Sequence, residues 1–239
     1  MTPPDLLTAE AVSEEQSLVE RYARRANEGL ERRSVDPIIR LLDVVLASVA
    51  LAILSPLLLG AAVAIRLTSM GPVLYRGLRV GKGGHLFTMV KFRTLKEDAE
   101  TRLGPYLGLE LSRLTVGELT TVGRWLRRTH LDEAPQLWNV LKGEMSLAGP
   151  RPVRPFFFEK LCTEVPQYWQ RLVVPPGMTG LAQIRLTREE TWEDKLAHDL
   201  EYIADRSIGL YFHVLSETAL RVLRRLSSSC AASGEPFAG

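Results

Sequence analysis

The stretch from Val44 to Ile65, VVLASVALAILSPLLLGAAVAI, contains no charged residue over 22 positions. About 20 helical residues cross the hydrocarbon core of a bilayer, so this stretch has the length and composition of a membrane segment. It begins far from the amino terminus and follows an acidic leader, which is not the pattern of an ordinary secretory signal. We therefore expect a membrane protein.

Ser55 and Pro56 lie near the middle of the segment. Proline has no backbone N–H and clashes with the preceding turn, so the helix should bend or break there. The two halves would be about 18 Å and about 14 Å long, and neither crosses a core of about 30 Å alone. Arginine and lysine on both sides fit a re-entrant segment that returns to the same face. A plain span that tolerates its proline fits equally well.

The chain as a whole has the composition of a folded protein, 46% hydrophobic and 24% charged. Alternating residues around a glycine-rich turn predict a short β-hairpin, Val73–Val80 with His85–Phe92. Apolar periodicity predicts one helix over 122–143, closed by Gly143, and a largely helical stretch over 191–226. The expected fold class is α+β and mostly helical.

Asp132 and Glu133 are adjacent carboxylates in a basic region. Thr129 lies three residues before Asp132, as in a capping box, so one interpretation is that the acids simply begin a helix. Alternatively, they act on a negatively charged substrate. A carboxylate at a helix start beside arginines should have a lowered pKa and stay ionised, as a nucleophile must. Arginine and Mg²⁺ would then mask the charge of a phosphoanhydride, since Mg²⁺ binds one or two carboxylates plus substrate phosphates.

Two further basic motifs are candidate phosphate sites. Arg151 lies between Pro150 and Pro152, and a guanidinium held by a restricted backbone suits bidentate phosphate binding, although a structural ion pair explains the motif equally well. Lys91 and Arg93 alternate on the predicted second strand and share a face, which is either solvent-exposed or part of a phosphate site.

These motifs together resemble the bacterial sugar transferases, the monotopic phosphoglycosyl transferases, from about Arg40 to about Leu223. The resemblance rests on RLLD before the Ser-Pro-interrupted segment, GPVLYRGLRVG, FTMVKFRTL, LRRTHLDEAPQLWNVLKGEMSLAGPRP and PGMTGLAQI. It implies transfer of a sugar-1-phosphate from a UDP-sugar to undecaprenyl phosphate or another polyprenyl phosphate. The reaction would be the first membrane step of surface glycan or exopolysaccharide assembly. It would take place at the cytoplasmic face of the bacterial inner membrane.

The resemblance also implies residue roles. Asp132 would be the nucleophile that forms a phosphosugar–enzyme intermediate and releases UMP, and Glu133 would assist it; both would be ligands of Mg²⁺. Ser55 and Pro56 would break the re-entrant helix. The residues expected to bind substrate are Lys91, Arg93, Arg127, Arg151 and Pro152.

The expected organisation has four parts. They are a leader with an amphipathic helix (1–35), a re-entrant membrane helix (36–66), a cytoplasmic catalytic domain with interfacial amphipathic helices (67–226) and a flexible tail (227–239). We expect a family member of the small type, with a homodimer possible and no nucleic-acid partner. Departures from the usual family pattern at Gly77, Leu95, Ala134 and Ala148 bear on substrate fit. The alternative function is a non-catalytic membrane-bound organiser of polysaccharide assembly.

Overall fold

The computed structural model describes residues 34–97, 99, 114–186 and 191–232. The expected leader helix therefore lies outside the described residues, apart from the last two positions of the 1–35 segment. The described part is mostly helical and contains two small two-stranded sheets. This confirms the expected α+β, mostly helical class.

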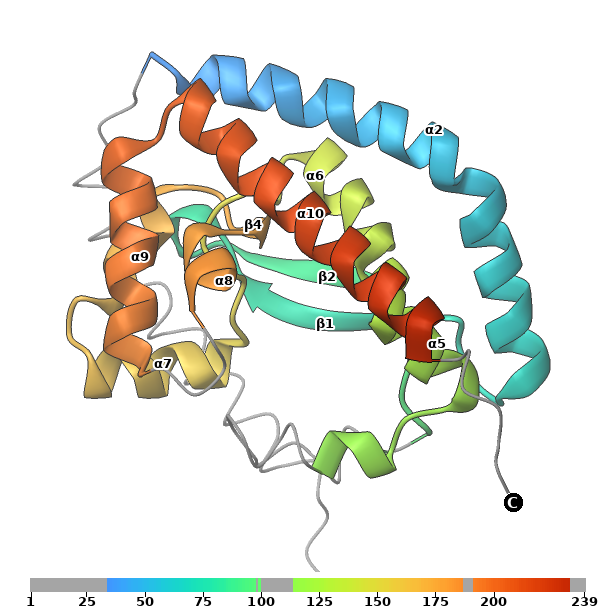
Figure 1. Ribbon diagram of the computed structural model, residues 1–239. Helices are drawn as coiled ribbons and strands as arrows, with labels where there is room; N and C mark the ends of the chain where they lie inside the picture. Colours follow the sequence, from blue (N-terminus) through green and yellow to red (C-terminus); the bar gives the residue numbers. More distant parts are fainter. Residues whose placement is uncertain (1–33, 98, 100–113, 187–190, 233–239) are drawn as a thin grey trace, which may run out of the picture.

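The apolar segment forms one helix, α2 (Asp36–Thr68), with Pro56 inside it. Figure 1 shows α2 running along one side of the molecule and turning sharply in its second half. Pro56 cannot donate to the carbonyl of Ala52, four residues earlier, and the Ser55 hydroxyl donates to that carbonyl instead, at 2.9 Å. The expected bend is present, but the structure shows a continuous helix rather than two helices with a break between them.

Helix α2 has two contrasting sides. Ile39, Asp43 and Ala47, four residues apart, are buried against the rest of the protein, as are Ala61 and Ile65 farther along. The opposite side exposes a row of large apolar residues: Ile38, Leu41, Val45, Val49, Ile53, Leu57, Leu59, Val63 and Leu67. Among the described helices, α2 alone is long and apolar enough to cross a membrane. The exposed row is therefore the surface that lipid would cover.

A buried carboxylate fastens the start of α2 to the rest of the fold. One oxygen of Asp43 accepts hydrogen bonds from the hydroxyl of Ser146 at 3.0 Å, the backbone N–H of Leu147 at 2.9 Å and the hydroxyl of Tyr211 at 2.9 Å. These partners come from two elements that are distant in the chain, β3 (Ser146–Ala148) and α10 (Ile208–Ala232). Asp43 thus joins α2 to β3 and to α10.

The predicted hairpin is confirmed. Strands β1 (Leu74–Val80) and β2 (Leu86–Phe92) pair antiparallel, with Leu74 opposite Phe92 and Val80 opposite Leu86. The connecting turn contains the short helix η1 (Lys82–Gly84), where Gly83 and Gly84 have φ values of 64° and 79°. Residues without a Cβ adopt these angles at little cost, which is why this turn is glycine-rich.

The stretch expected to form one helix over 122–143 is divided into three. Helix α5 (Thr121–Thr129) ends at His130, the short 3₁₀ helix η2 (Leu131–Gln136) follows, and α6 (Leu137–Lys142) continues from it. His130 has a φ of 58°, a left-handed conformation that no helix can continue through. The expectation of a single helix was wrong for this reason, whereas its predicted end is confirmed at Gly143, with a φ of 85°.

The capping-box interpretation of the acids was also wrong. Thr129 belongs to the last turn of α5, where its hydroxyl donates to the carbonyls of Trp125 and Leu126. It is therefore engaged with the helix before His130 and does not cap η2, in which Asp132 lies.

The remaining elements complete the part of the fold against which α2 packs. They are α7 (Pro155–Glu164), η3 (Tyr168–Val173), β4 (Gly177–Thr179), α8 (Leu181–Arg185), α9 (Trp192–Asp205) and α10. Strand β4 pairs parallel with β3. In Figure 1, α10 begins near the start of α2 and ends near α5, crossing in front of the hairpin. It continues to Ala232, past position 227 where the flexible tail was expected to begin.

Candidate active site

Asp132 and Glu133 lie in η2, directly after the left-handed residue His130. The Asp132 side chain is almost completely buried, with 6% of its surface exposed. Helix η2 packs against β2, and this contact brings Lys91 of β2 close enough to interact with both acids. The reversal at His130 is thus the local feature that turns the two acids toward the hairpin.

Asn139 holds β2 and α6 together beneath the site. Its side-chain amide donates to the carbonyl of Thr88 at 2.8 Å, and its oxygen accepts the N–H of Val90 at 3.0 Å. A buried asparagine thereby pairs with the outer edge of β2 as another strand would. Asn139 was not predicted from the sequence, although a polar residue inside an apolar helical pattern is a signal that could have found it.

The pKa of Asp132 is raised to about 6, against the expectation of a lowered value. Burial is the largest cause, and the negative charge of Glu133 adds to it; Lys91 and Arg127 act in the opposite direction and are outweighed. The expectation was wrong because it counted the neighbouring arginines and not the loss of water. At neutral pH the carboxylate is still mostly ionised, and it is a stronger base than an ordinary aspartate.

Glu133 forms an ion pair with Arg151, which lies in the Gly-Pro-Arg-Pro loop. The Arg151 guanidinium donates to the Glu133 carboxylate at 3.0 Å. Burial raises the pKa of Glu133, but the attraction of Arg151, this hydrogen bond and Lys91 together lower it below its ordinary value. Two neighbouring carboxylates therefore have pKa values shifted in opposite directions, which is a common sign of an active site.

Three of the basic residues expected to bind substrate lie close to the two acids. Burial lowers the pKa of Lys91 to about 8, although Glu133 and Asp132 oppose the shift. Arg127 acts on Asp132 electrostatically, and its Nε donates to the hydroxyl of Thr94 at 2.9 Å. Thr94 was not predicted, though it follows the Lys-Phe-Arg motif directly in the sequence. Lys91, Arg127 and Arg151 thus join the two acids in one charged cluster.

Arg93 lies elsewhere. Its guanidinium donates to the carbonyl and hydroxyl of Ser69 and to the carbonyl of Met70, just beyond the end of α2. The structure therefore does not bring Arg93 to the cluster with Lys91. Its contacts join the end of the membrane helix to the residue that follows β2.

The Gly-Pro-Arg-Pro loop is packed against the chain that carries β4. The N–H of Gly149 donates to the carbonyl of Thr179, and the N–H of Gly177 donates to the carbonyl of Pro150, each at 2.8 Å. A Cβ on Gly177 would lie 2.1 Å from the nitrogen of Gly149, so only glycine permits this approach. Pro152 is half-buried in the same loop, next to Arg151. The Gly-Pro-Arg-Pro loop and the loop before β4 thus support one another.

The donor set at Asp132 and Glu133 suits Mg²⁺. Two adjacent carboxylates raise the cost of ionising one another, as the effect of Glu133 on Asp132 shows, and a hard cation relieves that repulsion. Among the described residues no cluster of three or more His, Cys, Asp or Glu side chains is suited to hold a metal. Two carboxylates fit a cation whose remaining ligands come from substrate phosphates and water.

Comparison with known proteins gives matches over most of the chain. Residues 35–225 match the bacterial sugar transferase family. The chain is 41% identical over 203 residues to UDP-glucose:undecaprenyl-phosphate glucose-1-phosphate transferase of Caulobacter vibrioides, covering 81% of this chain and 73% of that protein. It is 36% identical to UDP-N-acetylgalactosamine-undecaprenyl-phosphate N-acetylgalactosaminephosphotransferase of Aeromonas hydrophila, with 76% and 43% covered.

A third relative is UDP-glucose:undecaprenyl-phosphate glucose-1-phosphate transferase of Xanthomonas campestris pv. campestris, 39% identical, with 76% of this chain and 38% of that protein covered. This chain thus spans less than half the length of the second and third relatives. The family match includes α2, the charged cluster and most of α10. Because the family match covers most of the chain and the Caulobacter vibrioides relative is matched over 73% of its length, this chain belongs to the bacterial sugar transferase family.

Proposed function

We propose that this protein transfers a sugar-1-phosphate from a UDP-sugar to undecaprenyl phosphate, and so begins the assembly of a surface glycan or exopolysaccharide. The observation that carries the proposal is the buried Asp132 with a pKa of about 6, among Lys91, Arg127 and Arg151. The relatives named above act, by their names, on UDP-sugars and undecaprenyl phosphate, and they differ in the sugar that they transfer.

The reaction proceeds in two displacements at phosphorus. A carboxylate oxygen of Asp132 attacks the phosphorus attached to the sugar, a new P–O bond forms, and the bond to the bridging oxygen breaks, so that UMP leaves with that oxygen. An oxygen of the polyprenyl phosphate then attacks the same phosphorus and displaces Asp132. The product is a polyprenyl diphosphate sugar, and the carboxylate is regenerated.

The basic residues stabilise charge in both displacements. Arg151 presents a planar guanidinium suited to two phosphate oxygens, and Lys91 and Arg127 lie beside the nucleophile. With a pKa of about 8, Lys91 loses its charge more readily than an ordinary lysine. Glu133 orients Arg151 through their ion pair and is available to assist the acceptor. When bound by Asp132 and Glu133, Mg²⁺ supplies further neutralisation of the diphosphate charge.

Membrane placement follows from α2 in this proposal. The helix bends at Ser55 and Pro56, returns to the side on which it entered and leaves the charged cluster at the cytoplasmic surface of the inner membrane. The continuous bend and the row of exposed apolar side chains support this topology. The lipid tail of the acceptor then stays in the bilayer while its phosphate reaches the site. A homodimer and the interfacial role of the other amphipathic helices stay predictions.

The test is a burst experiment with donor alone. Purified protein in nanodiscs is mixed with Mg²⁺ and each of several UDP-sugars, and UMP release and intact mass are measured. We expect one donor to give up to one UMP per active site and a mass increase equal to the sugar phosphate, located on Asp132. Asp132→Asn should abolish both and lower turnover with acceptor on the order of 10³-fold or more.

The matched control is Asp205→Asn, which changes an exposed aspartate at the end of α9 and should turn over normally. Normal turnover by Asp132→Asn would refute the assigned nucleophile. A wild-type protein that releases no UMP with any donor, with or without Mg²⁺, would favour the non-catalytic organiser instead.

A further inference from the structure

The loop that carries Arg151 is held through its carbonyl groups. The carbonyl of Pro150 accepts the N–H of Gly177 at 2.8 Å, and the carbonyl of Val153 accepts the N–H of Val80 at 3.0 Å. Pro150 and Pro152 have no N–H to donate, so the loop depends on such acceptor contacts for its conformation. These two bonds fix the backbone on either side of Arg151.

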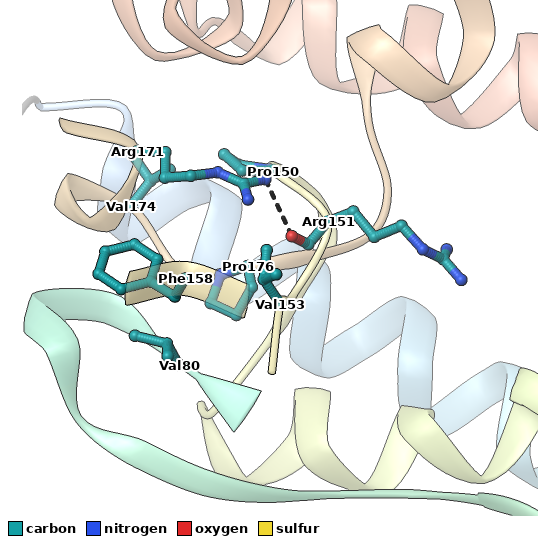
Figure 2. A pocket seen from close by; sticks show the side chains of 8 residues that line it. All are labelled: Val80, Pro150, Arg151, Val153, Phe158, Arg171, Val174 and Pro176. Carbon is teal, nitrogen blue, oxygen red and sulfur yellow. Dashed lines mark hydrogen bonds between the residues drawn. The ribbon is translucent and has the colours of Figure 1, made fainter. Parts of the chain in front are cut away.

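Between them, the carbonyl of Arg151 is held by a side chain. Nη2 of Arg171 donates to this carbonyl at 2.9 Å, and Figure 2 shows the bond together with the Arg151 side chain extending away from it. The two ends of Arg151 therefore have different partners. Its main chain is bound to Arg171, and its guanidinium is bound to Glu133 in the charged cluster.

Arg171 is itself well fixed. Its side chain is 6% exposed, and Nη2 also donates to the carboxylate of Asp199 on α9 at 2.7 Å. Its Nη1 donates to the hydroxyl of Tyr168, a buried residue packed against Phe158 and Trp192. A paired, buried guanidinium has little freedom to move, so it is a rigid donor for the carbonyl that it holds.

The Arg151 side chain, by contrast, is 56% exposed and has several rotatable bonds. A small displacement of its backbone would move the guanidinium away from Glu133 and from any phosphate bound between them. Misplacement by about 1 Å can cost an enzyme on the order of 100-fold in rate. The position of Arg151 thus depends on a contact made by a residue 20 positions later in the chain.

We propose that Arg171, paired with Asp199, is a positioning residue that holds Arg151 in the geometry needed to bind the donor diphosphate. This inference rests on the function proposed above. A purely structural role, in which the ion pair only joins η3 to α9, would also make Arg171 important for stability. The two roles differ in whether the effect of Arg171 passes through Arg151.

A double-mutant cycle separates the two roles. Wild type, Arg171→Met, Arg151→Ala and the double variant are compared in nanodiscs for steady-state UMP release, with kcat and KM for the donor measured separately and melting temperature recorded at the assay conditions. We expect Arg171→Met to lower kcat/KM for the donor on the order of 100-fold in the wild-type background. In the Arg151→Ala background, Arg171→Met should lower kcat/KM less than about 3-fold, because the Arg151 side chain that Arg171 positions is already absent.

Arg206→Met is the matched control, since Arg206 is also buried and forms an ion pair, with Asp36 at 2.7 Å, away from the loop. Its effect should be the same in both backgrounds. If Arg171→Met does not stay folded, Arg171→Lys, which keeps the positive charge for Asp199, takes its place in the cycle. The inference is overturned if the Arg171 variant has an equal effect in both backgrounds or none in the wild type. A wild type without UMP release would instead refute the proposed function.

Discussion

At the scale of the residue, the defining property of the site is the contrast between Asp132 and Glu133. They are adjacent and bear the same charge, yet the pKa of Asp132 is raised and that of Glu133 is lowered. The difference comes from their partners, because Glu133 has a direct ion pair with Arg151 whereas the attraction of Lys91 and Arg127 for Asp132 does not offset its burial. The buried, basic carboxylate is the one suited to attack phosphorus, and the cost of burying it reduces stability.

Asp132→Asn should therefore stabilise the protein while inactivating it. The pKa of Asp132 is about 6 in the folded state and 3.8 ordinarily. Below pH 3.8 the group is protonated in both states and has no effect; between these values the unfolded state loses its proton first, so wild-type stability falls as pH rises. Without Mg²⁺ at a pH of about 7.5, we expect the variant to be more stable by about 1–3 kcal/mol, with the difference disappearing near a pH of about 4.

Melting temperature in EDTA across this pH range measures the effect. Glu133→Gln is the opposite control, because the lowered pKa of Glu133 means that its charged form stabilises the folded state, and the variant should melt lower than wild type at the upper end of the range. A lower melting temperature for Asp132→Asn under the same conditions would contradict the assigned electrostatics.

At the scale of the element, Ser55 and Pro56 act as a pair within α2. Proline removes the N–H that would serve the Ala52 carbonyl, and the neighbouring hydroxyl serves it instead. Such replacement matters most in lipid, where no water can bond the freed carbonyl. The helix can therefore bend inside a bilayer without leaving a polar group unpaired.

In a bilayer, Ser55→Ala should lower stability by about 1–3 kcal/mol, the usual cost of leaving a polar group without a partner where water cannot reach it. In a Pro56→Ala background the same change should cost little, because the restored N–H of residue 56 serves the carbonyl. Melting temperatures of the four proteins in nanodiscs give the comparison. Equal losses in both backgrounds would mean that the hydroxyl does not substitute for the missing donor.

At the scale of the whole molecule, polar contacts bind both ends of α2 to the rest of the fold. Asp36 pairs with Arg206, and Arg40 donates to two carbonyls at the end of α6. Asp43, one turn farther along, accepts the N–H of Leu147. Just past the far end of the helix, Arg93 donates to the carbonyl of Ser69. Apolar residues of α2 also pack against both strands of the hairpin. Helix α2 and the charged cluster are thus one structural unit, which would keep the proposed nucleophile at a set position relative to the apolar surface of the helix.

Asp43→Ala should disturb this unit more than any change on the lipid side. It removes the acceptor for three donors and should cost on the order of 3 kcal/mol, whereas Asp43→Asn keeps an oxygen for them and should cost less. Ser48→Ala, on the exposed side of the same helix, is the control and should have little effect. Melting temperature and UMP release measure the outcome; an Asp43→Ala protein as stable as Ser48→Ala would show that this anchor is dispensable.

The amino-acid sequence by itself determined the features that depend on near neighbours in the chain. The uncharged run from Val44 to Ile65 is a helix with a bend at its proline, the glycine-rich turn joins a hairpin, and Gly143 ends a helix. The adjacent acids Asp132 and Glu133 also indicated where the charged cluster lies. Each of these follows from local backbone geometry, hydrophobic pattern or a short sequence motif.

Tertiary structure alone decided the environment of those residues. The pKa of Asp132 rose because packing against β2 removed water from it, which no local pattern records. Arg93 and Lys91 were equivalent in sequence, yet Arg93 donates to residues at the end of α2 whereas Lys91 interacts electrostatically with the two acids. Arg171 meets the carbonyl of Arg151 only because the fold brings their loops together. Desolvation and long-range contact are properties of the folded chain, so the sequence could indicate the chemistry but not its geometry.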